Sequence, residues 1–123
     1  MSRLSSDVEG AAGGYCMSPL NSRAKGKRAE LELCSILAPY WPAVCRNLDQ
    51  FSADKRDVLN VPGLHIQVKH VEQLNIWKAL NQAITESDPT DIPVVAFRRN
   101  RSPWYAAMEL EELIPLLRLK EAA

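Results

Sequence analysis

The chain has 123 residues, of which 46% are hydrophobic and 24% charged, as expected for one soluble domain with a modest core. Basic and acidic residues balance to a formal net charge of zero, so any affinity for nucleic acid has to come from local clusters. Cys16, Cys34 and Cys45 form neither an even set nor a CxxC motif, which argues against a disulfide framework or a zinc site and favours the reducing cytoplasm. We expect no membrane span and no signal peptide.

Residues 1–20 differ in composition from the rest of the chain. Ser5 and Ser6 precede a run of glycine and alanine over residues 10–14, which has little to bury. We expect a flexible tail over residues 1–20 and a single folded domain over residues 21–123, with Met17 as an alternative start.

The first predicted helix runs to about Leu37 from a cluster of basic residues, which are Arg23, Lys25, Lys27 and Arg28. Its apolar stripe consists of Ala29, Leu33, Ile36, Leu37 and Tyr40. Glu30 lies at one edge of this stripe, where a carboxylate can reach toward a sheet, and Glu32 lies at the other edge. Solvated surface roles are the alternative for Glu30 and for the basic cluster. Cations at a helix N-terminus oppose the helix dipole, which slightly favours contact with phosphate.

Residues 39–42 contain two prolines that end this helix, and a short strand is predicted over residues 43–46 before a polar loop over residues 47–56. Two strands then flank the turn Pro62-Gly63. The second strand alternates strictly, with an apolar set pointing one way and a polar set the other. The apolar set is Leu64, Ile66 and Val68, and the polar set is His65, Gln67 and Lys69.

Asp57, from the preceding strand, is the acid of a candidate site that also contains the amide of Gln67 and the amine of Lys69. We prefer Asp57 to Asp54 because Asp57 adjoins strand residues that can hold it rigidly. A two-residue hairpin loop would put Asp57 opposite Val68, on the core face. Reaching the face of Gln67 requires a three-residue loop, a bulge or a twist, and we predict such an irregularity. His65 is interpreted as a surface or packing histidine, because a lone histidine is rarely a ligand.

Asn75 is a good N-cap for a second helix that runs to about Glu86. Its apolar stripe consists of Ile76, Trp77, Leu80, Ala83 and Ile84, and Gln82 lies off this stripe. A buried strand is predicted over residues 92–97, a further strand over residues 103–108, and a final helix over residues 109–119 that Pro115 kinks or breaks. The element order, αβββαββα, predicts an α/β sandwich with a mixed sheet and one parallel crossover.

The hairpin tip between the last two strands is rich in arginine. Arginine binds phosphate bidentately and tryptophan stacks on an exposed base, so this tip is a candidate DNA contact. The alternative is a charged turn that keeps the protein soluble. The residues concerned are Arg98, Arg99, Arg101 and Trp104.

Five blocks in order resemble the PD-(D/E)XK nuclease superfamily, and within it the phage-encoded endonucleases described as Holliday-junction resolvases. The blocks are Lys25-Gly26-x-x-x-Glu30, Asp57, residues 62–69, residues 74–83 and residues 93–104, and the resemblance covers about residues 21–114. It implies a restriction-endonuclease-like core and a Mg²⁺-dependent endodeoxyribonuclease that is active on branched DNA, with Mn²⁺ as a substitute and a homodimer as the working unit.

The resemblance also implies roles for single residues. Asp57, Gln67 and the Val68 carbonyl would bind the metal, and Glu30 would orient water or a second ion. Lys69 would activate the nucleophile or steady the phosphate, and Gln82 would lie near the scissile phosphate. Position 67 is usually Glu or Asp in the superfamily, and glutamine, which occurs there in some active members, brings a carbonyl oxygen but no charge.

Two other functions stay open. The missing charge at Gln67 motivates a DNA-binding protein whose catalytic site has decayed, which would bind DNA in a salt-dependent way without cutting it. The zero net charge motivates an α/β interaction module that binds no nucleic acid.

Overall fold

The computed structural model describes residues 19–49 and 53–122, with side chains from residue 23 onward. The predicted tail lies almost wholly outside these ranges, as do Met17 and Cys16. The elements follow the predicted order: α1 (Pro19–Leu37), β1 (Cys45–Arg46), β2 (Val58–Leu59), β3 (Leu64–His70), α2 (Ile76–Glu86), β4 (Ile92–Arg98), β5 (Tyr105–Ala107) and α3 (Leu110–Ala122). None of the helices described is long and apolar enough to cross a membrane.

The five strands form one mixed sheet in the order β1-β2-β3-β4-β5. β3 and β4 are parallel over their whole length, and the other three pairs are antiparallel. The chain crosses from β3 to β4 through α2, as a parallel pair requires. The α/β class and the mixed sheet that the sequence predicts are therefore confirmed.

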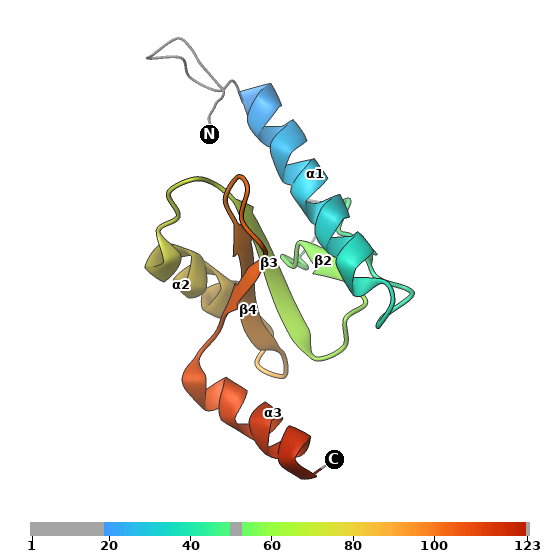
Figure 1. Cartoon of the computed structure of the whole chain (residues 1–123), viewed down its shortest axis with the longest axis vertical. Coiled ribbons are helices and arrows are strands. Elements are labelled where there is room, and N and C mark those ends of the chain that lie inside the picture. Colours follow the sequence, from blue (N-terminus) through green and yellow to red (C-terminus); the bar gives the residue numbers. More distant parts are fainter. Residues whose placement is uncertain (1–18, 50–52, 123) are drawn as a thin grey trace.

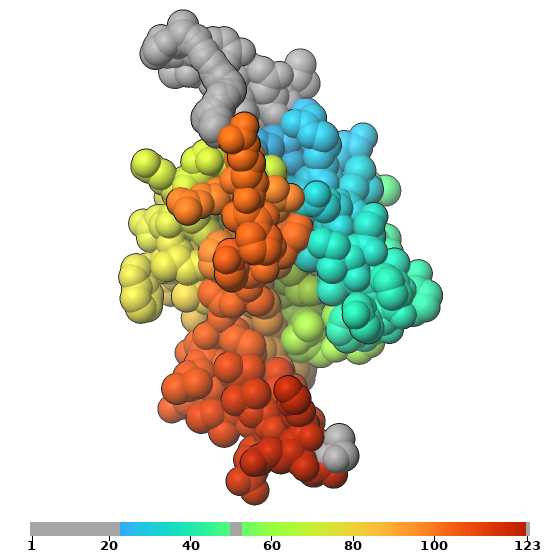
Figure 2. Space-filling model, viewed as in Figure 1, coloured from blue at the N-terminus to red at the C-terminus, as the bar shows by residue number. Residues whose placement is uncertain are grey.

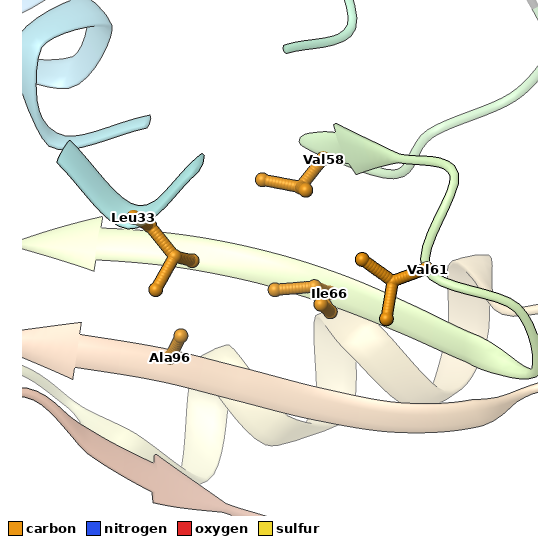
Figure 3. Close-up of a cluster of buried hydrophobic side chains, with 5 residues drawn as sticks. All are labelled: Leu33, Val58, Val61, Ile66 and Ala96. Carbon is orange, nitrogen blue, oxygen red and sulfur yellow. The ribbon is translucent and has the colours of Figure 1, made fainter. Parts of the chain in front are cut away.

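Helices cover both faces of the sheet (Figure 1). On one face Leu33 of α1 packs over strand residues in a single apolar cluster, which comprises Leu33, Val58, Val61, Ile66 and Ala96 (Figure 3). On the other face Ala79 and Ala83 of α2 pack against Val95. Leu64, Ile66 and Val68 thus belong to the face under α1, and the opposite face of β3 carries the polar set.

The predicted apolar stripes are wrong at their margins. Ile36 and Tyr40 of the first stripe are 46% and 74% exposed, and Trp77 and Ile84 of the second are 80% and 40% exposed. β1 and β2 have two residues each, so the sheet is too narrow there to cover the end of α1. α2 meets the sheet through its two alanines, and this close approach leaves one side of its stripe in solvent.

Two features of the helices also differ from expectation. α1 begins at Pro19, so the basic cluster lies within the helix and not at its N-terminus, and the helix-dipole argument for phosphate contact does not apply. Of the predicted kink or break at Pro115, the break is wrong, because α3 is one continuous helix with Pro115 inside it; none of its side chains is fully buried.

The connection between β2 and β3 has the predicted irregularity. Val58 pairs with Ile66, so three residues, 61–63, separate the next matched positions, Asn60 and Leu64. Asn60 and Gly63 both adopt positive φ angles, of 69° and 81°, to make this turn. One residue before β2, the N–H of Asp57 donates to the Ile66 carbonyl at 3.0 Å, and its side chain lines the same cavity as Gln67. This register brings Asp57 to the face of Gln67.

The turn and α1 provide a matched pair of glycine substitutions. Gly63→Ala forces a side chain into a positive φ angle and is expected to lower the free energy of unfolding by about 1 kcal/mol. Gly26→Ala, within α1 and with open space at its Cβ position, is expected to raise it by about 0.5–1 kcal/mol. Urea unfolding measures both, and equal effects of the two substitutions would contradict the turn geometry.

Candidate functional site

A cavity of about 320 Å³ lies where α1, the segment before β2, β3 and α2 meet. Four residues that the sequence singled out line it, namely Glu30, Asp57, Gln67 and Gln82. They come from four separate parts of the chain. Glu86 and Arg46, which the sequence analysis did not select, line the same cavity.

Asp57 is held by the backbone of β3. The Val68 N–H donates to its Oδ2 at 2.8 Å. In an extended strand the N–H and C=O of one residue point to the same side, so the Val68 carbonyl also faces this edge. Burial raises the pKa of Asp57 to about 6 despite that hydrogen bond, with a further upward contribution from the charge of Glu30 and a downward one from Lys69. The carboxyl is therefore easily protonated, and a bound cation would favour its ionised form.

Glu30 reaches the cavity from α1, but it has a partner there. Its Oε1 accepts a hydrogen bond from Nε of Arg46 at 2.9 Å, and both side chains are 20% exposed. Asp54 similarly pairs with Arg56 at 2.6 Å, and that ion pair lowers the pKa of Asp54. Of the two aspartates compared in the sequence, Asp57 is the one whose carboxylate contacts the β3 backbone.

Gln67 is 2% exposed, and three polar atoms lie within hydrogen-bonding distance of its amide nitrogen. Nε2 lies 3.0 Å from the Lys55 carbonyl, 3.0 Å from Oε1 of Glu86 and 2.9 Å from Nε2 of His65. His65 is a packing residue, also 2% exposed, and burial lowers its pKa. Among the described residues none donates a hydrogen bond to Oε1 of Gln67.

The oxygen atoms around this cavity belong to chemical groups that bind a hard divalent cation. Asp57 contributes a carboxylate, Val68 a backbone carbonyl and Gln67 a buried amide oxygen for which the described residues provide no donor. Mg²⁺ prefers such oxygen ligands together with water. The described part of the chain contains no group of three or more His, Cys, Asp or Glu residues placed to hold a metal ion. These three candidate ligands carry little negative charge, because the Gln67 side chain and the Val68 carbonyl are neutral.

Lys69 lies next along the polar face of β3. Its ammonium donates to Oε1 of Gln82 on α2 at 3.2 Å, and its charge lowers the pKa of Asp57. The structure thus brings Lys69 and Gln82 together beside the acidic part of the site. An ammonium in this position can meet a phosphate oxygen.

The predicted DNA-contacting residues fall into two groups. Arg98 and Trp104 both donate to Oε1 of Glu32, at 2.7 and 2.9 Å, and the Arg98 guanidinium lies 5.9 Å from the Trp104 ring centroid. These contacts fasten the β4–β5 hairpin to α1, and they lower the pKa of Glu32, first through Arg98. Glu32, which lies at the other edge of the α1 stripe from Glu30, is thus a structural acceptor.

The second group is exposed. Arg99 and Arg101 lie at the hairpin tip, where Arg101 has a φ angle of 64°. On α1, Arg23, Lys27 and Arg28 are exposed and Lys25 is half-buried. The hairpin (orange) and this part of α1 (blue) lie side by side at one end of the molecule (Figure 2), in agreement with their contacts through Glu32.

The sequence analysis missed Glu86 as a site residue. A signal for it was present, because Glu86 follows Gln82 by four residues and therefore shares its helix face. Arg46 gave no such signal. It pairs with Glu30 across 16 residues of sequence, and only the tertiary structure brings the two together.

Asp57 makes the stability of the metal-free protein depend on pH. Its pKa is about 6 when folded and near 3.8 when exposed, so the folded state holds the proton more tightly and the free energy of unfolding falls as pH rises from about 4 to 6. Asp57→Asn keeps an oxygen for the Val68 N–H and removes this loss. Above pH 7 the variant is expected to be more stable by on the order of 1–3 kcal/mol.

Urea unfolding between pH 4 and 8 measures this effect, with Glu111→Gln on exposed α3 as the control. The advantage of Asp57→Asn should become small near pH 4, where the folded wild type is protonated and the exposed Asp57 of the unfolded chain, with a pKa near 3.8, is partly protonated. A wild-type curve that is parallel to the Asp57→Asn curve over this range would contradict the burial of an ionisable Asp57.

No protein-family model, curated protein or solved structure matches the chain. The case for a function therefore rests on the residues and geometry described above. Those are the three-residue turn, the carboxylate held by the β3 backbone, and the lysine next to it on the same face.

Proposed function

We propose that the protein is a metal-dependent endodeoxyribonuclease with a restriction-endonuclease-like core of the PD-(D/E)XK type. The observation that carries the proposal is the register of the β2–β3 hairpin. It brings Asp57 to the same face of the sheet as Gln67, in the cavity that Glu30 also lines. An acid, an oxygen donor and a lysine on adjacent strand positions are the groups that phosphodiester hydrolysis needs around a divalent ion.

In this proposal Asp57, Gln67 and the Val68 carbonyl hold Mg²⁺, or Mn²⁺ in its place. When bound, such an ion stabilises charge on the phosphate and lowers the pKa of water. Glu30 orients the attacking water or a second ion, and its bond to Arg46 limits its freedom. Lys69 steadies the scissile phosphate or assists the nucleophile, with Gln82 holding its ammonium in place.

The exposed basic residues form the proposed DNA contact. Arg99 and Arg101 at the hairpin tip and three residues of α1, Arg23, Lys27 and Arg28, can reach phosphates. Lys25 lies among them; burial lowers the pKa of His70, and the charge of Lys25 lowers it further. Arg98 and Trp104 serve this surface indirectly, because they fix the hairpin to α1 through Glu32.

A homodimer fits this activity, since a four-way junction has two strands to cut. α3 supports it: this 13-residue helix exposes Leu110, Ile114, Leu116, Leu117 and Leu119 and buries nothing. Such a helix is marginal in water without a covering surface. A two-fold antiparallel pair would set Glu111 and Glu112 in the first turn of α3 near Lys120 in the last turn of the second copy. The proposed working place is the cytoplasm, where the free thiols of Cys34 and Cys45 stay reduced.

A DNA-binding protein with a decayed site is the second candidate. The observation that favours it is the neutral Gln67, whose amide nitrogen faces Glu86. The described residues also provide no group of three or more His, Cys, Asp or Glu placed to hold a metal ion. This candidate predicts salt-dependent DNA binding without cleavage by any divalent ion. Absence of DNA binding at low salt would instead favour the α/β interaction module.

Cleavage of branched and linear DNA with Mg²⁺ or Mn²⁺ tests the nuclease directly. Asp57→Ala and Lys69→Ala are each expected to reduce the cleavage rate by on the order of 10²–10³-fold. Lys120→Ala, which removes an exposed cation on α3, should leave the rate unchanged. Equal rates for the wild type and both site variants would remove the assignment. Native mass measurements on the same samples are expected to show dimers.

The two groups of basic residues should behave differently. Arg99→Ala and Arg101→Ala each remove one phosphate contact and are expected to reduce the slope of log affinity against log salt by about 0.7–0.9. Arg98→Ala is expected to lower the melting temperature as well, since it breaks the bond to Glu32. Arg118→Ala, 80% exposed on α3, is the matched control. Equal salt slopes for all four variants would argue against a phosphate-binding hairpin.

A further inference from the structure

The amide of Gln67 has one permitted orientation. Its nitrogen carries two hydrogens, and the Lys55 carbonyl, the Glu86 carboxylate and the His65 ring nitrogen all lie within 3.0 Å of it. Reversing the amide would turn its oxygen toward the Lys55 carbonyl and the Glu86 carboxylate. A carbonyl and an ionised carboxylate can only accept hydrogen bonds, so neither could pair with that oxygen. At 2% exposure no bulk water relieves that repulsion.

Glu86 differs from the other two neighbours in its effect. The Lys55 carbonyl is backbone and is present whatever the side chains are. The His65 ring can accept or donate, depending on its tautomer. The ionised Glu86 carboxylate can only accept, and it brings a negative charge into a cavity that it shares with Asp57 and Gln67.

We infer that Glu86 is a positioning residue that fixes the Gln67 amide so that its carbonyl oxygen is presented to the cavity as a metal ligand. This inference rests on the proposed nuclease function. It makes residues 67 and 86 a matched pair, with a neutral donor on β3 and a charge on α2.

The matched pair has a consequence for substitutions. Gln67→Glu alone removes the donor and sets two carboxylates about 3.0 Å apart at a buried position. Exchanging the two, as in the double variant Gln67→Glu with Glu86→Gln, restores one donor and one acceptor to the pair. Glutamine at position 67 therefore depends on the acid at position 86, to which its amide donates, and an acid at position 67 would lose this hydrogen bond.

Thermal unfolding of the metal-free protein tests the pairing. Gln67→Glu is expected to lower Tm by about 5 °C or more. Adding Glu86→Gln to it should recover more than half of that loss, although Glu86→Gln in the wild-type background should not raise Tm. Independent, additive shifts of the two substitutions would overturn the matched pair.

Calorimetric titration with Mn²⁺ tests the positioning. Glu86→Ala is expected to weaken Mn²⁺ binding about 10-fold or more, as for other residues that orient a metal ligand. In a Gln67→Ala background the same substitution should change the affinity much less, because the ligand that it orients is gone. Glu111→Ala removes the same charge from α3 and should have no effect. Tm values of all variants show whether each is folded at the titration temperature.

The outcomes separate this inference from the function beneath it. If the wild type binds Mn²⁺ and cleaves DNA but Glu86→Ala weakens binding equally with and without Gln67, Glu86 acts on the metal by itself and the positioning role is wrong. If the wild type neither binds Mn²⁺ nor cleaves DNA, the nuclease proposal fails and the positioning role fails with it. The thermal cycle would then still decide whether residues 67 and 86 are paired.

Discussion

The hydrogen bond from the Val68 N–H to the Asp57 carboxylate depends on one constraint, the three-residue turn between β2 and β3. A turn shorter by one residue would reverse the side on which every β2 side chain lies. Asp57 would then face the apolar cluster under α1, and Val58 would face the cavity. The positive φ angles of Asn60 and Gly63 hold the turn, so two exposed residues decide where the acid of the site is placed.

The site is built from polar groups that the fold buries at a cost. Burial raises the pKa of Asp57, and Gln67 and His65 have almost no contact with solvent. A buried polar group without partners costs free energy, and here several neighbours offset that cost, among them Lys55, Glu86 and the β3 backbone. The same partners restrict the side chains to a few orientations, which is what a ligand set for a cation requires.

The charged residues outside the cavity are divided between structure and surface. Glu32, Arg98 and Trp104 fasten the last hairpin to α1, and this attachment orients the exposed arginines of the tip. A protein with zero net charge can still present a strong local positive field in this way. α3 (red) lies at the other end of the molecule (Figure 2), so a dimer formed through α3 would leave the cationic end open.

The sequence by itself determined the element order, the mixed sheet and the alternation of β3, because hydrophobic periodicity and turn residues are local properties. It also indicated that the length of the turn between β2 and β3 decides on which face of the sheet Asp57 lies. Only the tertiary structure decided that Ile36 and Trp77 are exposed, since exposure depends on how far the short strands extend beneath each helix. It alone paired Arg46 with Glu30 and Glu86 with Gln67, because contacts between residues distant in the chain leave no local pattern to read.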